Sequence, residues 1–164
     1  MDKDGSGSSS HSEAMHFVED VGLLLERGGT PRMAGRIVGW LLICDPPHQS
    51  TSQLVLVLGA SKASISTMTR LLIQMGLVEQ AGVPGQRRDH FRIKSGAWDE
   101  LMREVLEEIT IGRQLADRGL ELLEGKSAEL KRRLREVREM YAFFEEEYPA
   151  LLERWERERK KSGR

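Results

Sequence analysis

The stretch that decides the fold spans residues 50–94 and reads STSQLVLVLGASKASISTMTRLLIQMGLVEQAGVPGQRRDHFRIK. Its first part contains two helical signals in succession. Ser50 and Ser61 are good N-cap residues, and the apolar run that follows each of them ends at a glycine, Gly59 or Gly76. This spacing predicts two short helices joined by a tight turn, which is the arrangement of a helix-turn-helix.

The second of these helices has two unlike faces. Its apolar residues recur with helical spacing and predict the buried face: Ile65, Met68, Leu72 and Met75. At about 100° per residue, the opposite face carries small polar or cationic side chains and no carboxylate. These are Lys62, Ala63, Ser66, Thr67, Arg70 and Gln74. Small side chains let a helix enter a DNA major groove, where Arg and Lys reach guanine or phosphate. The alternative is an ordinary solvated face, although such faces elsewhere in this chain carry carboxylates.

Residues 77–94 favour a two-stranded β-hairpin after the two helices. Runs of extended character at 77–80 and 90–94 flank a turn whose tip is Pro84-Gly85-Gln86-Arg87-Arg88. Alternation divides the second run into an inward and an outward set. The inward set is Phe91 and Ile93, and the outward set is His90, Arg92 and Lys94. A helix-turn-helix followed by such a ribbon is a winged helix-turn-helix.

The hairpin has four cations within eight residues, namely Arg87, Arg88, Arg92 and Lys94. With six cations against two anions, residues 59–94 carry a net charge of +4, whereas residues 1–58 carry −3 and residues 95–164 carry −2. Such a local cationic patch indicates phosphate binding. The alternative is an ordinary basic hairpin, because Asp89 could pair with one of these cations. The expected DNA contacts are Lys62, Ala63, Ser66, Thr67, Arg70, Arg87, Arg88 and Arg92.

Two helices are expected before this motif. The first covers about 13–27, and the second runs from a Thr30-Pro31 cap to about Cys44. Gly35 and Gly39 lie four residues apart on one face of the second helix. Their spacing predicts that another helix approaches closely there.

Two long helices are expected after it, one over about 97–123 and one that starts at Ser127 with a capping box. The second helix carries an apolar stripe with a period of 3.5 residues, which is typical of coiled coils. This stripe consists of Leu130, Leu134, Val137, Tyr141, Phe144, Tyr148, Leu151 and Trp155. Pro149 should kink or restart the helix. The length of the stripe favours self-association over packing within one domain only.

Composition supports a mainly α (α+β) protein, a winged helix-turn-helix with long helical dimerisation extensions. Charged residues make up 31% and aromatic residues 5%, which suits long exposed helix faces. The expected parts are a disordered tail at 1–13, supporting helices at 14–45, the DNA-binding region at 46–96, dimerisation helices at 97–160 and a tail at 161–164. The single Cys44, most simply a small core residue, excludes an intramolecular disulfide and suits a reducing cytoplasm.

Other site chemistries find little support. His11, His16, His48 and His90 are scattered without metal-ligand spacing, so no metal is expected. No phosphate-binding glycine loop or nucleophile elbow is present, and no cofactor or enzymatic activity is expected. The apolar run before Cys44 is too short to span a membrane. A second hypothesis is a winged-helix module that binds protein instead of DNA, which would need apolar side chains at positions 63, 66, 67 and 70.

The order of these elements resembles the MarR-type winged-helix regulators, in the branch that includes GbsR-like proteins and among mycobacterial repressors of MmpL-class lipid and drug exporters. The resemblance rests on Phe17-Val18-Glu19, residues 34–42, Cys44-Asp45-Pro46, Gln49-Ser50, Ile65-Ser66-Thr67, Leu72-Ile73-Gln74, residues 85–88 and Phe91-Arg92. It departs from the family at Gln86, where the wing usually has an acid, and at Ile93-Lys94, where Leu-Thr is usual. Without that acid, Arg87 and Arg88 are expected either to be more mobile or to contact phosphate instead of a base.

The resemblance implies a homodimer that represses a nearby transport or efflux gene by occluding a near-palindromic operator in double-stranded DNA. It also implies release by a small apolar ligand, fatty-acid-like or drug-like, that binds between the DNA-binding and dimerisation parts. Candidate walls of that ligand site are Val21, Leu24, Trp40 and Ile109, and Arg36 or Arg113 would meet a polar head group. Residue by residue, simple core filling is an equally good interpretation.

Overall fold

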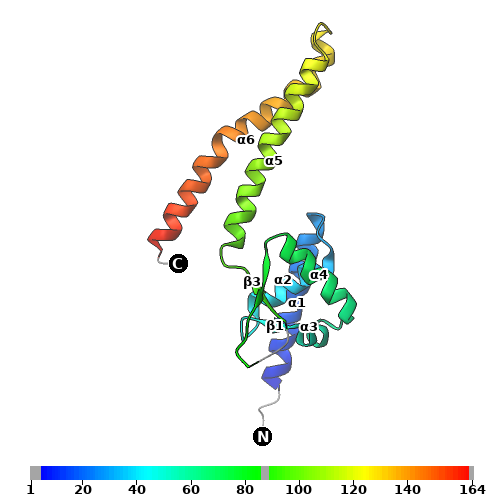
Figure 1. The fold of residues 1–164 in the computed structure, drawn as a ribbon, viewed down its shortest axis with the longest axis vertical. Helices are drawn as coiled ribbons and strands as arrows, with labels where there is room; N and C mark the ends of the chain where they lie inside the picture. Colours follow the sequence, from blue (N-terminus) through cyan, green and yellow to red (C-terminus); the bar gives the residue numbers. More distant parts are fainter. Residues whose placement is uncertain (1–4, 86–88, 163–164) are drawn as a thin grey trace. The chain divides into compact units, whose positions relative to one another are not determined.

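The computed structural model describes residues 5–85 and 89–162, which form two compact units, Met1–Trp98 and Asp99–Arg164. Figure 1 shows their elements along the chain. The first unit contains α1 (Gly5–Arg27), α2 (Arg32–Ile43), β1 (Gln49–Ser50), α3 (Thr51–Leu58), α4 (Lys62–Gln74), β2 (Val78–Ala81) and β3 (His90–Ile93). The second unit is built from α6 (Ala128–Lys161) and from α5 (Ala97–Leu122), whose first two residues fall in the first unit.

Helices α1 and α2 cross at glycine residues, so no side chain separates their backbones there. A Cβ added to Gly35 would lie 2.8 Å from the Cα of Gly22, and one added to Gly39 would lie 3.1 Å from the Cα of Val18. Backbone therefore packs directly on backbone at this crossing. The close approach predicted from the spacing of Gly35 and Gly39 is confirmed.

The core of the first unit gathers around α2, which contributes Ile37, Val38 and Leu41. Helices α3 and α4 pack onto it with a small set of fully or nearly fully buried side chains: Leu54, Leu58, Ile65 and Leu72. Both helices begin at the predicted serine caps, and the N-cap Ser50 forms a complete capping box with Gln53. Gly59 ends α3 in the left-handed conformation, with φ 61°. The predicted helix-turn-helix is therefore present.

The sheet has three strands in the order β1-β3-β2, where a two-stranded ribbon was expected. Gln49 and Ser50 pair with Phe91 and His90, so β3 is the central strand. For this reason His90 is only 3% exposed, and its predicted outward orientation is wrong. Its ring meets the ring of His48 edge to face, with the centroids 5.3 Å apart.

Two boundaries differ from the sequence-based expectation. Helix α1 begins at Gly5, so it extends through much of the segment predicted as a disordered tail at 1–13. The side chains from Ser9 to Glu13 are exposed, and Ser9 Oγ donates to Glu13 at 3.3 Å, so local hydrogen bonding sustains this extension. Helix α2 begins at Arg32 with Pro31 as its N-cap, one residue later than the Thr30-Pro31 signal suggested.

In the second unit, α5 and α6 form an antiparallel hairpin (Figure 1). Glycines on α5 leave room for large side chains of α6. A Cβ on Gly112 would lie 2.5 Å from the ring of Tyr141, and one on Gly119 would lie 3.0 Å from Leu134. Ser127 caps α6 by accepting from the Leu130 N–H at 3.3 Å. The predicted capping box is incomplete because leucine has no side-chain acceptor to return the bond.

Helix α6 continues through Pro149, so of the two outcomes predicted there, a kink or a restart, the restart does not occur. Proline removes one backbone donor, but contacts beyond it hold the helix against α5. Arg159 pairs with Asp99, and Arg103 pairs with Glu156 at 2.9 Å. These ion pairs lie on the C-terminal side of the proline and join the last turns of α6 to the start of α5. The helix reaches Lys161, the first residue of the tail predicted at 161–164.

Candidate nucleic-acid interface

The buried face of α4 fixes which side of the helix is presented to a partner. Ile65 and Leu72 are fully buried, as predicted from their spacing. Thr69, which lies on the same face, is 2% exposed and was missed because a hydroxyl reads as polar. Its Oγ1 donates to the Ile65 carbonyl at 2.9 Å, so the hydroxyl is satisfied inside the helix. The signal that could have found it is its position four residues after Ile65.

The opposite face of α4 presents a polar surface without acid. All six predicted side chains are exposed: Lys62, Ala63, Ser66, Thr67, Arg70 and Gln74. Arg70 Nε donates to the Ser66 carbonyl at 3.3 Å, which draws its side chain along the helix surface. Within the described part of the chain, neither Lys62 nor Arg70 pairs with a carboxylate. Both charges are therefore available to an anionic partner.

At least one cation of the predicted hairpin is paired with a carboxylate that the sequence did not suggest as its partner. Arg92 and Glu79 face each other across β3 and β2, and Arg92 Nε lies 2.6 Å from Glu79 Oε1. Sequence reasoning missed this pairing, although cross-strand register could have indicated it. The Arg92 side chain is 55% exposed, but Glu79 offsets much of its charge. Gln86, Arg87 and Arg88 lie outside the described residues.

The predicted ligand-lining residues are divided between the two units. In the first unit, Val21 and Trp40 are half-buried, whereas Leu24 is 64% exposed. The buried Nε1 of Trp40 has no hydrogen-bond partner among the described residues. Arg36 donates through Nη2 to the Leu58 carbonyl at 3.2 Å and is thus engaged within its own unit. In the second unit, Ile109 is half-buried.

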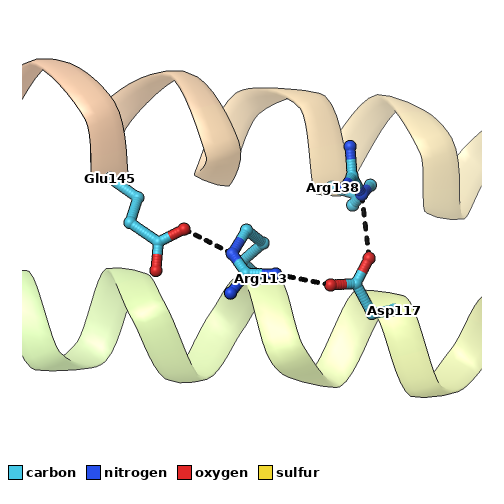
Figure 2. A network of polar contacts seen from close by, with 4 residues as sticks. All are labelled: Arg113, Asp117, Arg138 and Glu145. Atoms are coloured by element: carbon cyan, nitrogen blue, oxygen red, sulfur yellow. Dashed lines mark hydrogen bonds and ion pairs between the residues drawn. The ribbon is translucent and has the colours of Figure 1, made fainter.

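Arg113 lies in a network of four charged residues between α5 and α6 (Figure 2). Its Nε donates to Glu145, and its Nη1 donates to Asp117 Oδ2 at 2.6 Å. Arg138 Nε donates to the other oxygen of Asp117 at 2.8 Å. The bond from Arg113 lowers the pKa of the Glu145 carboxyl, and the bond from Arg138 lowers the pKa of Asp117. A ligand head group would have to displace these carboxylates to reach Arg113.

The remaining chemistry is limited. The structure brings His48 and His90 together, although the sequence suggested scattered histidines. In the described ranges, no three His, Cys, Asp or Glu side chains are placed to hold a metal ion. Burial raises the pKa of the Cys44 thiol, which fits a half-buried packing residue. None of the described helices is both long and apolar enough to cross a membrane.

Comparison with known proteins agrees with this geometry. The MmpR5-like MarR family transcriptional regulators match residues 96–158. The HTH-type transcriptional regulator MmpR5 of Mycobacterium tuberculosis (strain ATCC 25618 / H37Rv) is 41% identical over 133 residues, which is 81% of each chain. A crystal structure of a transcriptional regulator is 39% identical with a TM-score of 0.72, covering 88% of this chain and 99% of that one. Neither relative is named as GbsR-like, so that finer assignment stays a prediction.

These relatives confirm the predicted winged-helix fold and a DNA-binding regulatory function, and a family of transcriptional regulators points away from an enzyme. The exposed face of α4 supplies the surface that such a function requires. The chain belongs to the MarR family of transcriptional regulators, within its MmpR5-like group.

Proposed function

We propose that this regulator is a cytoplasmic homodimeric repressor that reads a near-palindromic operator with the outward face of α4. The observation that carries the proposal is the acid-free exposed surface of Lys62, Ser66, Thr67 and Arg70. Side chains of this kind can contact base edges and phosphates in a major groove. We assign base discrimination to Ser66, Thr67 and Arg70, and backbone contacts to Lys62, with Ala63 in apolar contact.

The proposed dimer is supported by the apolar stripe of α6, whose first seven residues alternate between exposed and half-buried positions, while the eighth, Trp155, is 55% exposed. Leu134, Tyr141 and Tyr148 are half-buried against α5, and the hydroxyl of Tyr148 donates to Met102 Sδ at 3.3 Å. The residues at the alternate positions are 41%, 42%, 44% and 51% exposed: Leu130, Val137, Phe144 and Leu151. Helix α6 buries none of its residues fully. An uncovered apolar row of this length suits a second copy of the chain.

A twofold dimer would present two recognition helices together. They would then meet half-sites about one helical turn apart, roughly 10 base pairs, on one face of the DNA. Occupation of such a site within a promoter would exclude transcription from it. The nature of the regulated gene, a nearby transport, efflux or lipid-export gene, is proposed from the family resemblance alone.

A small apolar ligand, fatty-acid-like or drug-like, is proposed to release the DNA. The half-buried Trp40 and Val21 offer apolar surface in the first unit, and the unpartnered Trp40 Nε1 offers a donor. Arg113 is a weaker candidate than the sequence suggested because Glu145 and Asp117 already occupy it. Release requires that the ligand bind the DNA-incompetent dimer more tightly than the DNA-bound form.

The decisive experiment is a gel-shift titration across the DNA upstream of the protein's own gene, repeated at several salt concentrations. We expect one tight, footprinted near-palindrome bound by a dimer, and release when fatty-acid-like compounds are added. The double variant Arg87→Ala, Arg88→Ala should flatten the slope of log K against log salt by roughly 2 if both contact phosphate. Binding of equal strength to every fragment would contradict operator recognition.

A further inference from the structure

The turn between the two helices of the helix-turn-helix is held by a side chain from a third helix. Helix α3 ends at Leu58, Gly59 forms the turn, and Ser61 already caps α4. The last four carbonyls of an α-helix have no partner inside that helix. In α3 the carbonyl of Leu58, the last of these, accepts a hydrogen bond of 3.2 Å from Nη2 of Arg36 on α2. The positive charge also faces the negative end of the α3 dipole.

Arg36 reaches this carbonyl from a constrained position. Its side chain is only 21% exposed, and Glu19 Oε2 of α1 lies 3.2 Å from its Nε as an ion pair. The stem of Arg36 fills the space beside Gly22, where a Cβ would lie 2.9 Å from Arg36 Cγ. The Gly22–Gly35 crossing of α1 and α2 is adjacent. Arg36 therefore ties two closely packed helices to the end of α3.

We propose that Arg36 is a positioning residue for DNA binding, which fixes the Leu58–Ser61 turn and hence the orientation of α4 without touching DNA. A turn that samples other arrangements lowers the fraction of molecules that can bind. The apparent dissociation constant rises in inverse proportion to that fraction. The proposal does not depend on the dimer, the ligand or the operator sequence proposed above, since the relevant contacts all lie within the first unit.

Arg32 provides a matched control on the same helix. Its Nε donates to Glu19 Oε1 at 2.6 Å, so it shares the acid that pairs with Arg36. Its side chain is 48% exposed, and among the described residues its side-chain hydrogen bond and ion pair both go to Glu19 of α1, not to α3. If the Arg36–Leu58 bond is what matters, removing the charge at Arg36 and removing it at Arg32 should have different consequences.

The test compares Arg36→Met, Arg36→Lys and Arg32→Met in the full chain by DNA affinity, salt dependence and amide hydrogen exchange. For Arg36→Met we expect operator affinity to fall about tenfold, in line with loss of one hydrogen bond from a charged donor. The amides of Gly59 and Ala60 should exchange faster, and the salt slope should stay unchanged because no phosphate contact is lost. Arg36→Lys should recover much of the affinity, and Arg32→Met should match the parent protein.

Three results would overturn the proposal. Unchanged affinity and exchange in Arg36→Met would remove the positioning role. A salt slope reduced by about 1 would show that Arg36 contacts phosphate directly. An equal loss in Arg32→Met would assign the effect to Glu19. Should Arg36→Met fail to fold, Arg36→Lys carries the test: operator affinity and exchange at Gly59 must then change together, and a change in affinity with parent-like exchange would overturn the proposal.

Discussion

The two units of this chain are held together in different ways. In the first unit, side chains such as Ile37, Leu54 and Ile65 are completely shielded from water. In the described part of the second unit, residues 99–162, Ala116 is the only buried residue, and the hairpin relies on glycine contacts and ion pairs. The buried apolar side chains can keep the first unit rigid on its own. Exposed ion pairs contribute little stability, so the second unit needs a further surface to pack against.

The largest test of this difference puts charge on the uncovered row of α6. The double variant Val137→Glu, Phe144→Glu should yield a monomer, because two carboxylates would be buried in the proposed dimer. Loss of the second binding site should weaken operator binding about 100-fold or more. Light scattering and gel shifts give the two readouts, and circular dichroism should show the first unit still folded.

Arg132→Glu is the matched control, since it also changes the charge by two units and lies outside the stripe, with a side chain 68% exposed. It should remain dimeric. A Val137→Glu, Phe144→Glu protein that stays dimeric would show that the uncovered row has another purpose, and the contrast between the units would then lose its functional meaning.

A second test compares the glycine contacts of the two units. Gly35→Ala forces a Cβ to within 2.8 Å of backbone, whereas Gly112→Ala meets the ring of Tyr141 at 2.5 Å. A ring can move aside, but a packed backbone has less freedom. We expect Gly35→Ala to cost about 3 kcal/mol of unfolding free energy and Gly112→Ala about 1 kcal/mol, after the helix-propensity gain of alanine.

Urea unfolding followed by circular dichroism measures both changes. Gly82→Ala serves as the control, because a Cβ there would meet nothing within 4 Å. Equal costs at Gly35 and Gly112 would mean that the second unit is packed as tightly as the first. A larger cost at Gly112 would reverse the comparison.

A third test asks whether the rigid unit carries sequence discrimination. Arg70→Ala should cost on the order of 1–3 kcal/mol of binding free energy at the operator and much less on random DNA. The reason is that Arg70 is exposed, pairs with no carboxylate among the described residues, and projects from a helix whose other face is fixed in the core. Fluorescence anisotropy on both DNAs gives the ratio. An equal loss on both would demote Arg70 to a phosphate contact.

The sequence predicted local features well and long-range ones poorly. The polar face of α4 follows from helical periodicity alone, and the crossing at Gly35 follows from residue size. The third strand was missed because β1 has only two residues, and its pairing with β3 spans some forty positions. The same limit explains why the hydrogen bond from Arg36 to the Leu58 carbonyl was not predicted, since the two residues are 22 positions apart. No local pattern encodes such a contact, so it emerges only when the chain is folded.

The smallest expected effect concerns the ion pairs that hold α5 against α6. The pKa of Glu145 is lowered in the folded chain, chiefly by the bond from Arg113. A carboxyl whose folded pKa lies below its unfolded value stabilises the protein above the unfolded pKa, about 4.3 for Glu. That contribution is lost as the pH falls through the folded pKa. The melting temperature of Glu145→Gln should therefore be slightly below that of the parent at pH 7, and the two should converge in acid.

Glu146→Gln gives the control, since it removes a carboxyl from the neighbouring position, whose side chain is exposed. Thermal melts of the three proteins between pH 7 and pH 3 measure the gap. A difference in melting temperature between Glu145→Gln and the parent that widens in acid would contradict the expected loss of the Glu145 contribution at low pH. If Glu145→Gln lowered the melting temperature as much as Gly35→Ala does, ion pairs would contribute to the second unit as much as close packing contributes to the first. We expect less because the four charged side chains drawn in Figure 2 are each partly exposed, so water and salt compete for them.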